Sequence, residues 1–341
     1  MRNYSIDKVK LLASFAVVFM HVVNYLPTTE FANYWTYDWY FPLLDLAVPL
    51  FFVFSGYFLS RKKTEQIPSY ANKILVMLVA YNIVYILIKW PMDILSGFIQ
   101  GKSGFELIFS YFDTMTWSNV ITGIFGSEHL WYLSALLYAS WILYYVNKHK
   151  LSSLTAFTLG ITLFLLIFIP PINYLWDNLL LYGGFVKGYF YLSMGYYLAK
   201  SRIYNPNKVY YFVATIILLV IIGSQINNQF FYELLLALVV FNIVNILKKN
   251  PGQPSILSNF SHHSLSIYLL HIIFTGIFNS VRGFVPGINH LNPVIVVVPM
   301  MIICIIGSVL LFPITEEYVH RPLVHMFNRQ LRKYNNSAQI K

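Results

Sequence analysis

The sequence contains little charge. Only 11% of its 341 residues are Asp, Glu, Lys or Arg, whereas soluble domains carry about 25%. By contrast, 57% of the residues are hydrophobic and the mean hydropathy is +0.60. A soluble core of this size would leave much of that apolar surface in water, so we expect an integral membrane protein.

Cysteine and nucleotide-binding motifs are also scarce. Cys304, the single cysteine, lies inside an apolar run, which excludes an internal disulfide and a thiolate metal site. The sequence has no glycine-rich phosphate loop, no Ser-His-Asp order and no metal-ligand cluster, and the pair His262 and His263 is too short a motif to predict one. We therefore expect no metal and no ATP-driven transport by this chain.

Long apolar runs are abundant. A membrane-spanning helix needs about 20 apolar residues, and about ten such runs lie near residues 6–26, 39–59, 72–90, 128–146, 153–170, 183–199, 209–224, 230–247, 262–281 and 292–314. They predict an all-α, polytopic membrane helix bundle, with one transmembrane domain over 1–325 and a solvated, partly disordered cytoplasmic tail over 326–341. No small-residue cleavage site follows the first run, so we expect an uncleaved helix rather than a signal peptide.

The basic residues predict the orientation. With the N-terminus inside and alternating spans, the inner segments hold 19 of the 23 Lys and Arg residues, and only Lys89, Lys102, Lys187 and Arg282 fall on the outer half. This bias favours an even number of spans, with both termini on the cytoplasmic side of a bacterial inner membrane. It explains the net charge of +10 better than binding to nucleic acid does. The more polar residues 91–127 predict an interfacial helix on the outer face.

The first run carries a polar stripe. Lys10 and His21 are eleven positions apart, which is about 20° beyond three full helical turns and about 16 Å along the axis. The two side chains therefore share one helix face. Polar groups inside a span usually face the bundle interior and have a function, although Lys10 can also snorkel to the surface and His21 can hydrogen-bond a neighbouring helix.

The ninth run carries a second stripe, in which Ser264, Tyr268, His271 and Thr275 follow the spacing i, i+4, i+7, i+11. Small polar residues of this kind commonly join helices. The fourth run opens with Glu128, His129 and Trp131 at its outer end. A Glu-His pair beside a membrane histidine is suited to bind or polarise an acceptor, whereas Trp131 is equally typical of an interfacial aromatic belt.

The second run combines a backbone signal with a basic cluster. Pro49 and the pair Ser55-Gly56 predict a kink or a close backbone approach. Arg61, Lys62 and Lys63 follow directly. They are typical of a stop-transfer anchor, and they are also suited to hold the phosphates of an anionic cofactor.

Four motifs resemble the acyltransferase type 3 family of bacterial membrane O-acyltransferases. They are "IDKVKLLASFAVVFMH", "VPLFFVFSGYFL", "HLWYLSALL" and "SLSIYLLHIIF", which occur in the family's order between residue 6 and about residue 275. Within the family, the outline is most similar to the enterobacterial-common-antigen O-acetyltransferase type. Two positions depart from the pattern: Lys10 stands where Arg is common, and His320 stands where many relatives have Glu. Lysine keeps the charge of arginine but lacks its bidentate fork.

The resemblance implies transfer of an acyl group, usually acetyl, from cytoplasmic acyl-CoA to a hydroxyl of a cell-surface polysaccharide or lipid-linked sugar. His21 is then the expected general base, since an imidazole removed from water stays neutral and can accept a proton. A covalent acyl-histidine relay stays open as an alternative to direct transfer. Lys10, Ser55, Arg61, Lys62 and Lys63 are expected on the acyl-CoA side. Tyr268 and His271 are expected to stabilise the oxyanion or to orient the acceptor, and Glu128, His129 and Trp131 to bind the acceptor.

Two other classes of function fit the sequence. Buried polar stripes are equally suited to a transporter or flippase of a lipid-linked envelope sugar. A sensor or scaffold of an envelope synthesis complex would use the same spans without chemistry at the histidines. The sequence does not predict the oligomeric state, the acceptor or the acyl chain length.

Overall fold

The computed structural model describes residues 2–24, 40–99, 115–169, 184–201, 208–225, 229–284 and 293–338, together with Ser103 and Phe109. The described residues form helices and no strands. The helices are α1 (Tyr4–Asn24), α2 (Phe41–Leu44), α3 (Ala47–Leu59), η1 (Thr64–Gln66), α4 (Ile67–Ile99), α6 (Trp117–Thr122), η2 (Glu128–Leu130), α7 (Trp131–Lys148), α8 (Ser153–Leu166), α10 (Gly184–Lys200), α11 (Lys208–Gln225), α12 (Gln229–Lys249), α13 (Ile256–Phe260), η4 (Ser261–His263), α14 (Ser264–Phe284), α15 (Pro293–Thr315), η6 (Glu316–His320) and α16 (Arg321–Ala338).

The expected all-α class is confirmed for the described residues, and each of the ten apolar runs coincides with helix. The second run is divided into α2 and α3 by a turn at residues 45–46. The fourth run begins with the short 3₁₀ helix η2 before α7 starts at Trp131. These two interruptions matter because both lie next to the polar groups described below.

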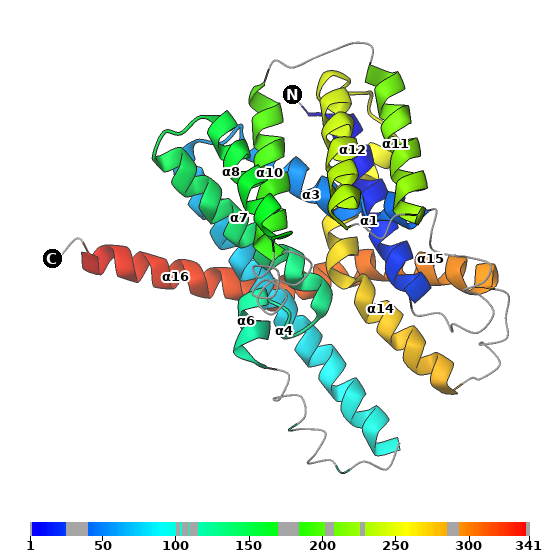
Figure 1. Ribbon diagram of the computed structural model, residues 1–341. Coiled ribbons are helices and arrows are strands. Elements are labelled where there is room, and N and C mark those ends of the chain that lie inside the picture. The colour runs from blue at the N-terminus through cyan, green and yellow to red at the C-terminus, as the bar shows by residue number, and fades with distance from the viewer. Residues whose placement is uncertain are drawn as a thin grey trace.

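Helix α10 lies at the centre of the bundle and packs against α3, α7 and α8. Figure 1 shows α8, α10, α11 and α12 standing side by side, while α4 and α14 extend away from them and α15 and α16 cross the lower part of the bundle. The interior is aromatic, and its largest fully buried side chains include Phe52, Tyr189 and Tyr191. Helix α1 packs against α3, α14 and α15. It thereby joins the central helices to the helices that extend away from them or cross below them.

Glycine allows α3 and α10 to approach closely. A Cβ atom added to Gly56 would lie 1.8 Å from the carbonyl oxygen of Leu192, and one added to Gly195 would lie 1.9 Å from that of Val53. Only a residue without a side chain fits between two backbones at such distances. Of the two expectations for Ser55-Gly56, the close backbone approach is therefore confirmed.

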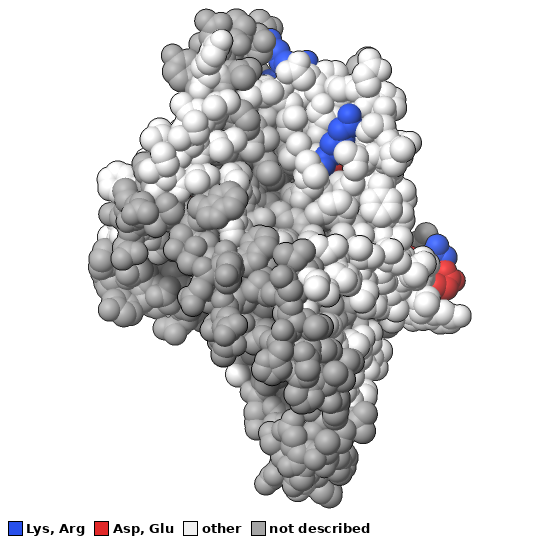
Figure 2. Space-filling view, turned by 90° about the vertical axis from the view of Figure 1, so that its right-hand side faces the viewer, with Lys and Arg blue, Asp and Glu red and all other residues white. Residues whose placement is uncertain are grey.

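Several helices are suited to a lipid environment. Among the described residues, four segments are long and apolar enough to cross a membrane: Phe41–Leu59, Thr64–Met92, Gln229–Lys249 and Ile295–Gln330. Helix α15 exposes Ile302, Ile303, Ile306 and Leu310, which is the pattern of a lipid-facing surface. The described part of the face in Figure 2 carries few charged atoms. The ten spans and their orientation remain predictions.

The basic helix ends gather on one side. The C-terminal turns of α10 and α12 carry Lys200 and Lys248, and Figure 1 shows the N-terminus, the end of α10 and the start of α11 at the same, upper end of the molecule. This end, which we call the basic end, is the one that the charge pattern assigns to the cytoplasm.

The structure describes helices in two segments outside the ten apolar runs. In the predicted cytoplasmic tail, α16 continues to Ala338 and places Leu323 and Phe327 at helical spacing. In the stretch 91–127, α4 continues through Pro91 to Ile99 and α6 follows at Trp117–Thr122. Most of the residues between them lie outside the described ranges.

Candidate functional site

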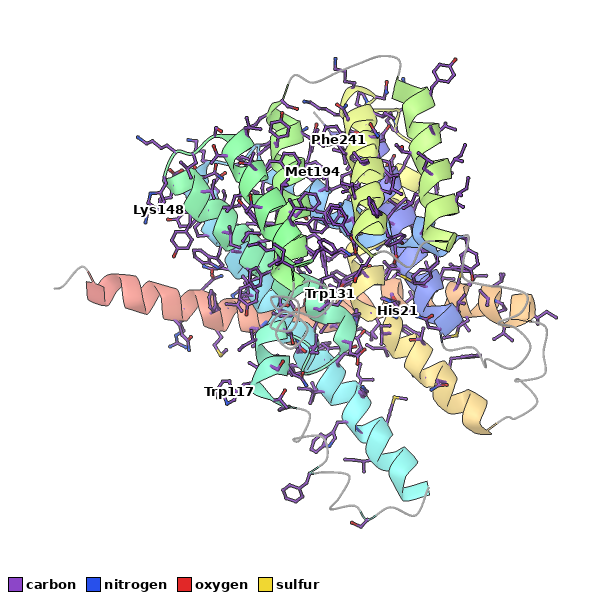
Figure 3. All side chains as sticks on the ribbon, in the orientation of Figure 1. His21, Trp117, Trp131, Lys148, Met194 and Phe241 are labelled. Carbon is purple, nitrogen blue, oxygen red and sulfur yellow. The ribbon has the colours of Figure 1, made fainter. Side chains whose placement is uncertain are left out.

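Three histidines from distant parts of the chain meet inside the bundle. The ring of His271 on α14 lies 5.1 Å from the ring of His21 on α1 and 5.3 Å from the ring of His129 on η2, measured between centroids. Figure 3 labels His21 at the end of α1 remote from the basic end. We call His21, His129 and His271 the histidine cluster.

His129 is held by hydrogen bonds at both ring nitrogens. Its Nε2 lies 3.3 Å from the carbonyl oxygen of Leu269, and its Nδ1 lies 2.9 Å from the Ser127 hydroxyl. A carbonyl oxygen only accepts, so Nε2 carries the proton and Nδ1 accepts from Ser127. The Tyr85 hydroxyl donates to the same Leu269 carbonyl at 2.9 Å. His129 is thus fixed in one tautomer and one orientation.

The loop before His129 is fixed by Asn82 of α4. Its amide donates to the carbonyl of Gly123 at 3.0 Å, and its side-chain oxygen accepts from the Gly126 amide at 2.6 Å. A Cβ atom on Gly126 would lie 2.6 Å from the Asn82 carbonyl oxygen, so glycine is required there. These contacts explain how the turn between α6 and η2 presents Ser127 and His129 to the interior.

His271 has one occupied and one open nitrogen. Its Nδ1 donates to the carbonyl oxygens of Ile267 at 3.0 Å and Tyr268 at 2.8 Å, which places the proton on Nδ1. Its Nε2 is buried and has no hydrogen-bond partner among the described residues. The neutral ring therefore presents a proton acceptor inside the bundle, close to His21.

His21 is less enclosed. Its side chain is partly exposed and forms no hydrogen bond with the described part of the chain. Lys10 lies three turns nearer the basic end on the same helix, is partly buried, and likewise has neither a hydrogen bond nor an ion pair within the described ranges. The polar stripe predicted on the first helix thus leads from an unpaired ammonium to the histidine cluster.

The polar stripe predicted on α14 faces the interior, since Ser264, Tyr268, His271 and Thr275 are all buried. The Tyr268 hydroxyl donates to the backbone carbonyl of His129. In this arrangement its proton is already used to join α14 to η2, which fits a positioning role better than the expected donation to an oxyanion.

Aromatic rings connect the histidine cluster with α3. The Tyr268 ring lies 5.3 Å from Tyr132 and 6.1 Å from Phe51. The Ser55 hydroxyl, one turn beyond Phe51 toward the end of α3, donates to the Phe51 carbonyl at 2.8 Å. Ser55 therefore lies between the histidine cluster and the segment that follows α3.

The basic residues after α3 are exposed, as expected for either of their two predicted roles. Arg61 stacks over the Tyr57 ring, with its guanidinium carbon 5.1 Å from the ring centroid, and donates to the Tyr57 hydroxyl at 3.2 Å. Lys62 and Lys63 extend beside it. The three side chains form a positive surface at the end of α3.

The expected Glu-His pair at the start of the fourth run is not brought together. Glu128 is exposed whereas His129 is buried, because consecutive residues of η2 point in different directions. Trp131 packs its ring 6.3 Å from Phe52, inside the bundle. Near the end of the chain, His320, which departs from the family pattern, donates to Glu316 at 2.9 Å within η6. This histidine therefore has a structural partner in its own helix.

Sequence reasoning missed Tyr85, Ser127 and Asn82. Ser127 lies two residues before the motif "HLWYLSALL", but the role of its hydroxyl becomes clear only when the structure places the His129 ring next to it. Tyr85 and Asn82 lie in an apolar run without a motif, so no sequence signal identifies them. The described residues contain no group of three or more His, Cys, Asp or Glu arranged to hold a metal ion.

The described residues form an apolar helical bundle whose interior holds the three imidazoles of the histidine cluster, two of them hydrogen-bonded. The family model described as "Acyltransferase domain" matches residues 3–312, so the chain belongs to the acyltransferase type 3 family. The match covers every residue of the histidine cluster. No curated protein and no solved structure matches the chain significantly. The protein is therefore a membrane acyltransferase.

Proposed function

We propose that this protein transfers an acetyl group from cytoplasmic acetyl-CoA to a hydroxyl group of an envelope carbohydrate, with His21 as the general base. One observation carries the proposal: the His21 ring lies 5.1 Å from the ring of His271, whose Nε2 has no partner among the described residues, and Lys10 lies on the same face of α1 nearer the basic end. A proton acceptor and a cation for the donor thus belong to one helix.

The chemistry requires one proton acceptor at the reacting hydroxyl. The oxygen of the acceptor hydroxyl attacks the thioester carbonyl carbon, and its proton passes to a ring nitrogen of His21. The C–S bond then breaks, the acetyl group stays on the acceptor oxygen, and the CoA thiolate takes up the proton. His271 accepts a hydrogen bond or the proton itself at Nε2, because its Nδ1 proton is fixed by the carbonyls of α14.

The donor is expected to enter from the basic end. CoA carries several phosphates, and its thioester lies at the end of a long flexible arm. Arg61, Lys62 and Lys63 are exposed at the end of α3 and suit the phosphates. Lys10 serves as a point charge nearer the bundle interior. Ser55 lies between this region and the histidine cluster, where it would contact the acyl arm.

The acceptor is expected from the opposite side. In the predicted orientation, the histidine cluster lies in the outer half of a bacterial inner membrane, where a lipid-linked sugar or a growing polysaccharide is within reach. A hydroxyl is the matching nucleophile, since a neutral imidazole is a competent base for it. The acceptor side of the site therefore selects the carbohydrate, and the basic end selects the donor.

The test uses membranes that contain the full chain and radiolabelled acetyl-CoA. We expect His21→Ala to lower the rate of label transfer into extracted glycolipid or polysaccharide by about 10³-fold, the range of a lost general base. Acetyl-CoA should still raise the melting temperature of purified His21→Ala protein, since the donor site stays intact.

Equal rates for wild type and His21→Ala would reject His21 as the base. A wild-type protein that neither transfers the label nor gains stability from saturating acetyl-CoA would reject the acetyl-CoA donor itself. His262→Ala is the matched control, because His262 is an exposed histidine of η4 that lies outside the histidine cluster.

A further inference from the structure

A second polar cluster joins α2, α10 and α12. Tyr232 donates to the Asp45 carboxylate at 2.5 Å, and Lys187 forms an ion pair with Glu233. The Tyr191 hydroxyl lies within electrostatic range of Asp45, Tyr232 and Glu233. We call these five residues the charge cluster. It lies at the ends of α10 and α12 that are remote from the basic end (Figure 1).

Two polar atoms of the charge cluster have no partner among the described residues. They are the Glu233 oxygen Oε2 and the Tyr191 hydroxyl, and both are buried. The Glu233 side chain is 9% exposed, and Tyr191 is 0% exposed. A buried carboxylate oxygen and a buried hydroxyl without hydrogen bonds are unfavourable, so a purely structural ion pair would be expected to satisfy them.

The cluster is open on one side. The Lys187 side chain is 21% exposed, and Asp45 and Tyr232 are also partly exposed. Both unpartnered atoms are themselves shielded from solvent, so a polar group that enters there reaches them by displacing the partly exposed side chains at this opening. Charged side chains within a membrane bundle usually mark a substrate path, and this one opens on the side from which the acceptor is expected.

The chemistry of the cluster favours a neutral polyhydroxyl ligand. Two carboxylates face one ammonium, so an anion would be repelled by the excess negative charge, and Lys187 would oppose a bare cation. A sugar hydroxyl both donates and accepts. It can donate to Glu233 Oε2 and accept from the Tyr191 hydroxyl, while a neighbouring hydroxyl accepts from Lys187.

Aromatic residues at the start of α3 connect the charge cluster with the histidine cluster. Asp45 lies in the turn before α3 and precedes Phe51 by six residues, and the Phe51 ring lies 6.1 Å from the rings of Tyr132 and Tyr268, measured between centroids. Next to Lys187, a Cβ atom on Gly188 would lie 2.9 Å from the Phe52 ring. A sugar held at the charge cluster can therefore extend over these rings toward His21 and His271.

We infer that the charge cluster is a carbohydrate-binding subsite that holds the hydroxyl groups of the acceptor while another part of the acceptor reaches the histidine cluster. The inference rests on the proposed function for the identity of the ligand as acceptor. The binding itself requires no acyl transfer, so it is tested without acetyl-CoA.

The experiment measures binding of radiolabelled octyl glycosides to the full chain in lipid nanodiscs. The probes are the octyl glycosides of glucose, galactose and N-acetylglucosamine below their micelle concentrations, with octyl tetraethylene glycol as the amphiphile without a sugar. Tyr191→Phe removes only the unpartnered hydroxyl. Tyr189→Phe is the matched control, since Tyr189 is buried on the same helix but donates to the Ala156 carbonyl at 3.2 Å.

We expect at least one glycoside to bind saturably to wild type and to Tyr189→Phe, and to bind about fivefold more weakly to Tyr191→Phe, the effect of one hydrogen bond. Glu233→Gln provides a second variant with the same expected direction. Equal affinity in all variants, or no saturable glycoside binding beyond that of the control amphiphile, would overturn the inference. Specific binding without any acetyl transfer by wild type would reject the proposed function and retain this subsite.

Discussion

The histidine cluster and the charge cluster solve the burial of polar groups in different ways. His129 and His271 have ring nitrogens that are oriented by backbone carbonyls of α14, at Ile267, Tyr268 and Leu269. The charge cluster uses formal charges that pair across α10 and α12. The difference indicates two tasks, because neutral imidazoles can exchange a proton with a substrate whereas an ion pair fixes a geometry for recognition.

Replacing His271 should produce the largest effect on this contrast. In His271→Asn the new amide can keep the contact with the Tyr268 carbonyl, but the substitution removes the acceptor at Nε2. We expect acetyl transfer to fall by about 10²-fold with little change in melting temperature. His129→Asn should instead lower the melting temperature, because it breaks the contacts with Ser127 and Leu269. Initial rates and thermal unfolding of both purified variants separate the two roles, and identical profiles would contradict them.

Breaking the ion pair should have the next largest effect, this time on stability. Glu233→Leu leaves Lys187 without its partner, and we expect the free energy of unfolding to fall by about 3 kcal/mol. The double variant Lys187→Met/Glu233→Leu should recover most of this loss while still binding the glycosides weakly. Unfolding in detergent with increasing denaturant measures both. Additive losses in the double variant would show that the two residues do not act as a pair.

Lys10 should have the smallest effect. Removing its charge in Lys10→Ala is expected to raise the KM for acetyl-CoA about tenfold, the loss of one charge-assisted contact, with a smaller change in kcat. Lys10→Arg keeps the charge and should retain the KM within a few-fold. Rates measured over a range of acetyl-CoA and salt concentrations test this. A fall in kcat with unchanged KM would place Lys10 in the chemical step instead.

The sequence predicts the helices of this bundle well because apolar length is a local signal. The polar stripes of α1 and α14 can also be predicted from the sequence, since Lys10 and His21 share a face of α1 and His271 belongs to a stripe at helical spacing on α14. The charge cluster was not, because Asp45, Lys187 and Glu233 lie alone in separate apolar runs and meet only after three helices pack. Likewise, η2 turns Glu128 outward and His129 inward, which no pair motif reveals.

The C-terminal helix α16 shows what composition alone does not predict. A polar composition after residue 325 predicts a solvated, partly disordered tail, whereas α16 continues to Ala338 and its Leu323 side chain packs against the core. Composition averages over all faces of a helix, whereas packing needs only one apolar face. Periodicity was therefore the more informative signal for this segment.

The glycine contacts between α3 and α10 have a mechanical consequence. Where two backbones touch at Gly56 and Gly195, sliding or rotation of one helix against the other would drive peptide atoms into each other. We expect α3 and α10 to move as one rigid unit, so that Ser55 on α3 and Lys187 on α10 keep a constant separation. Breathing motions that let two large substrates in and out then belong to helices joined through flexible side chains, such as α1 and α14.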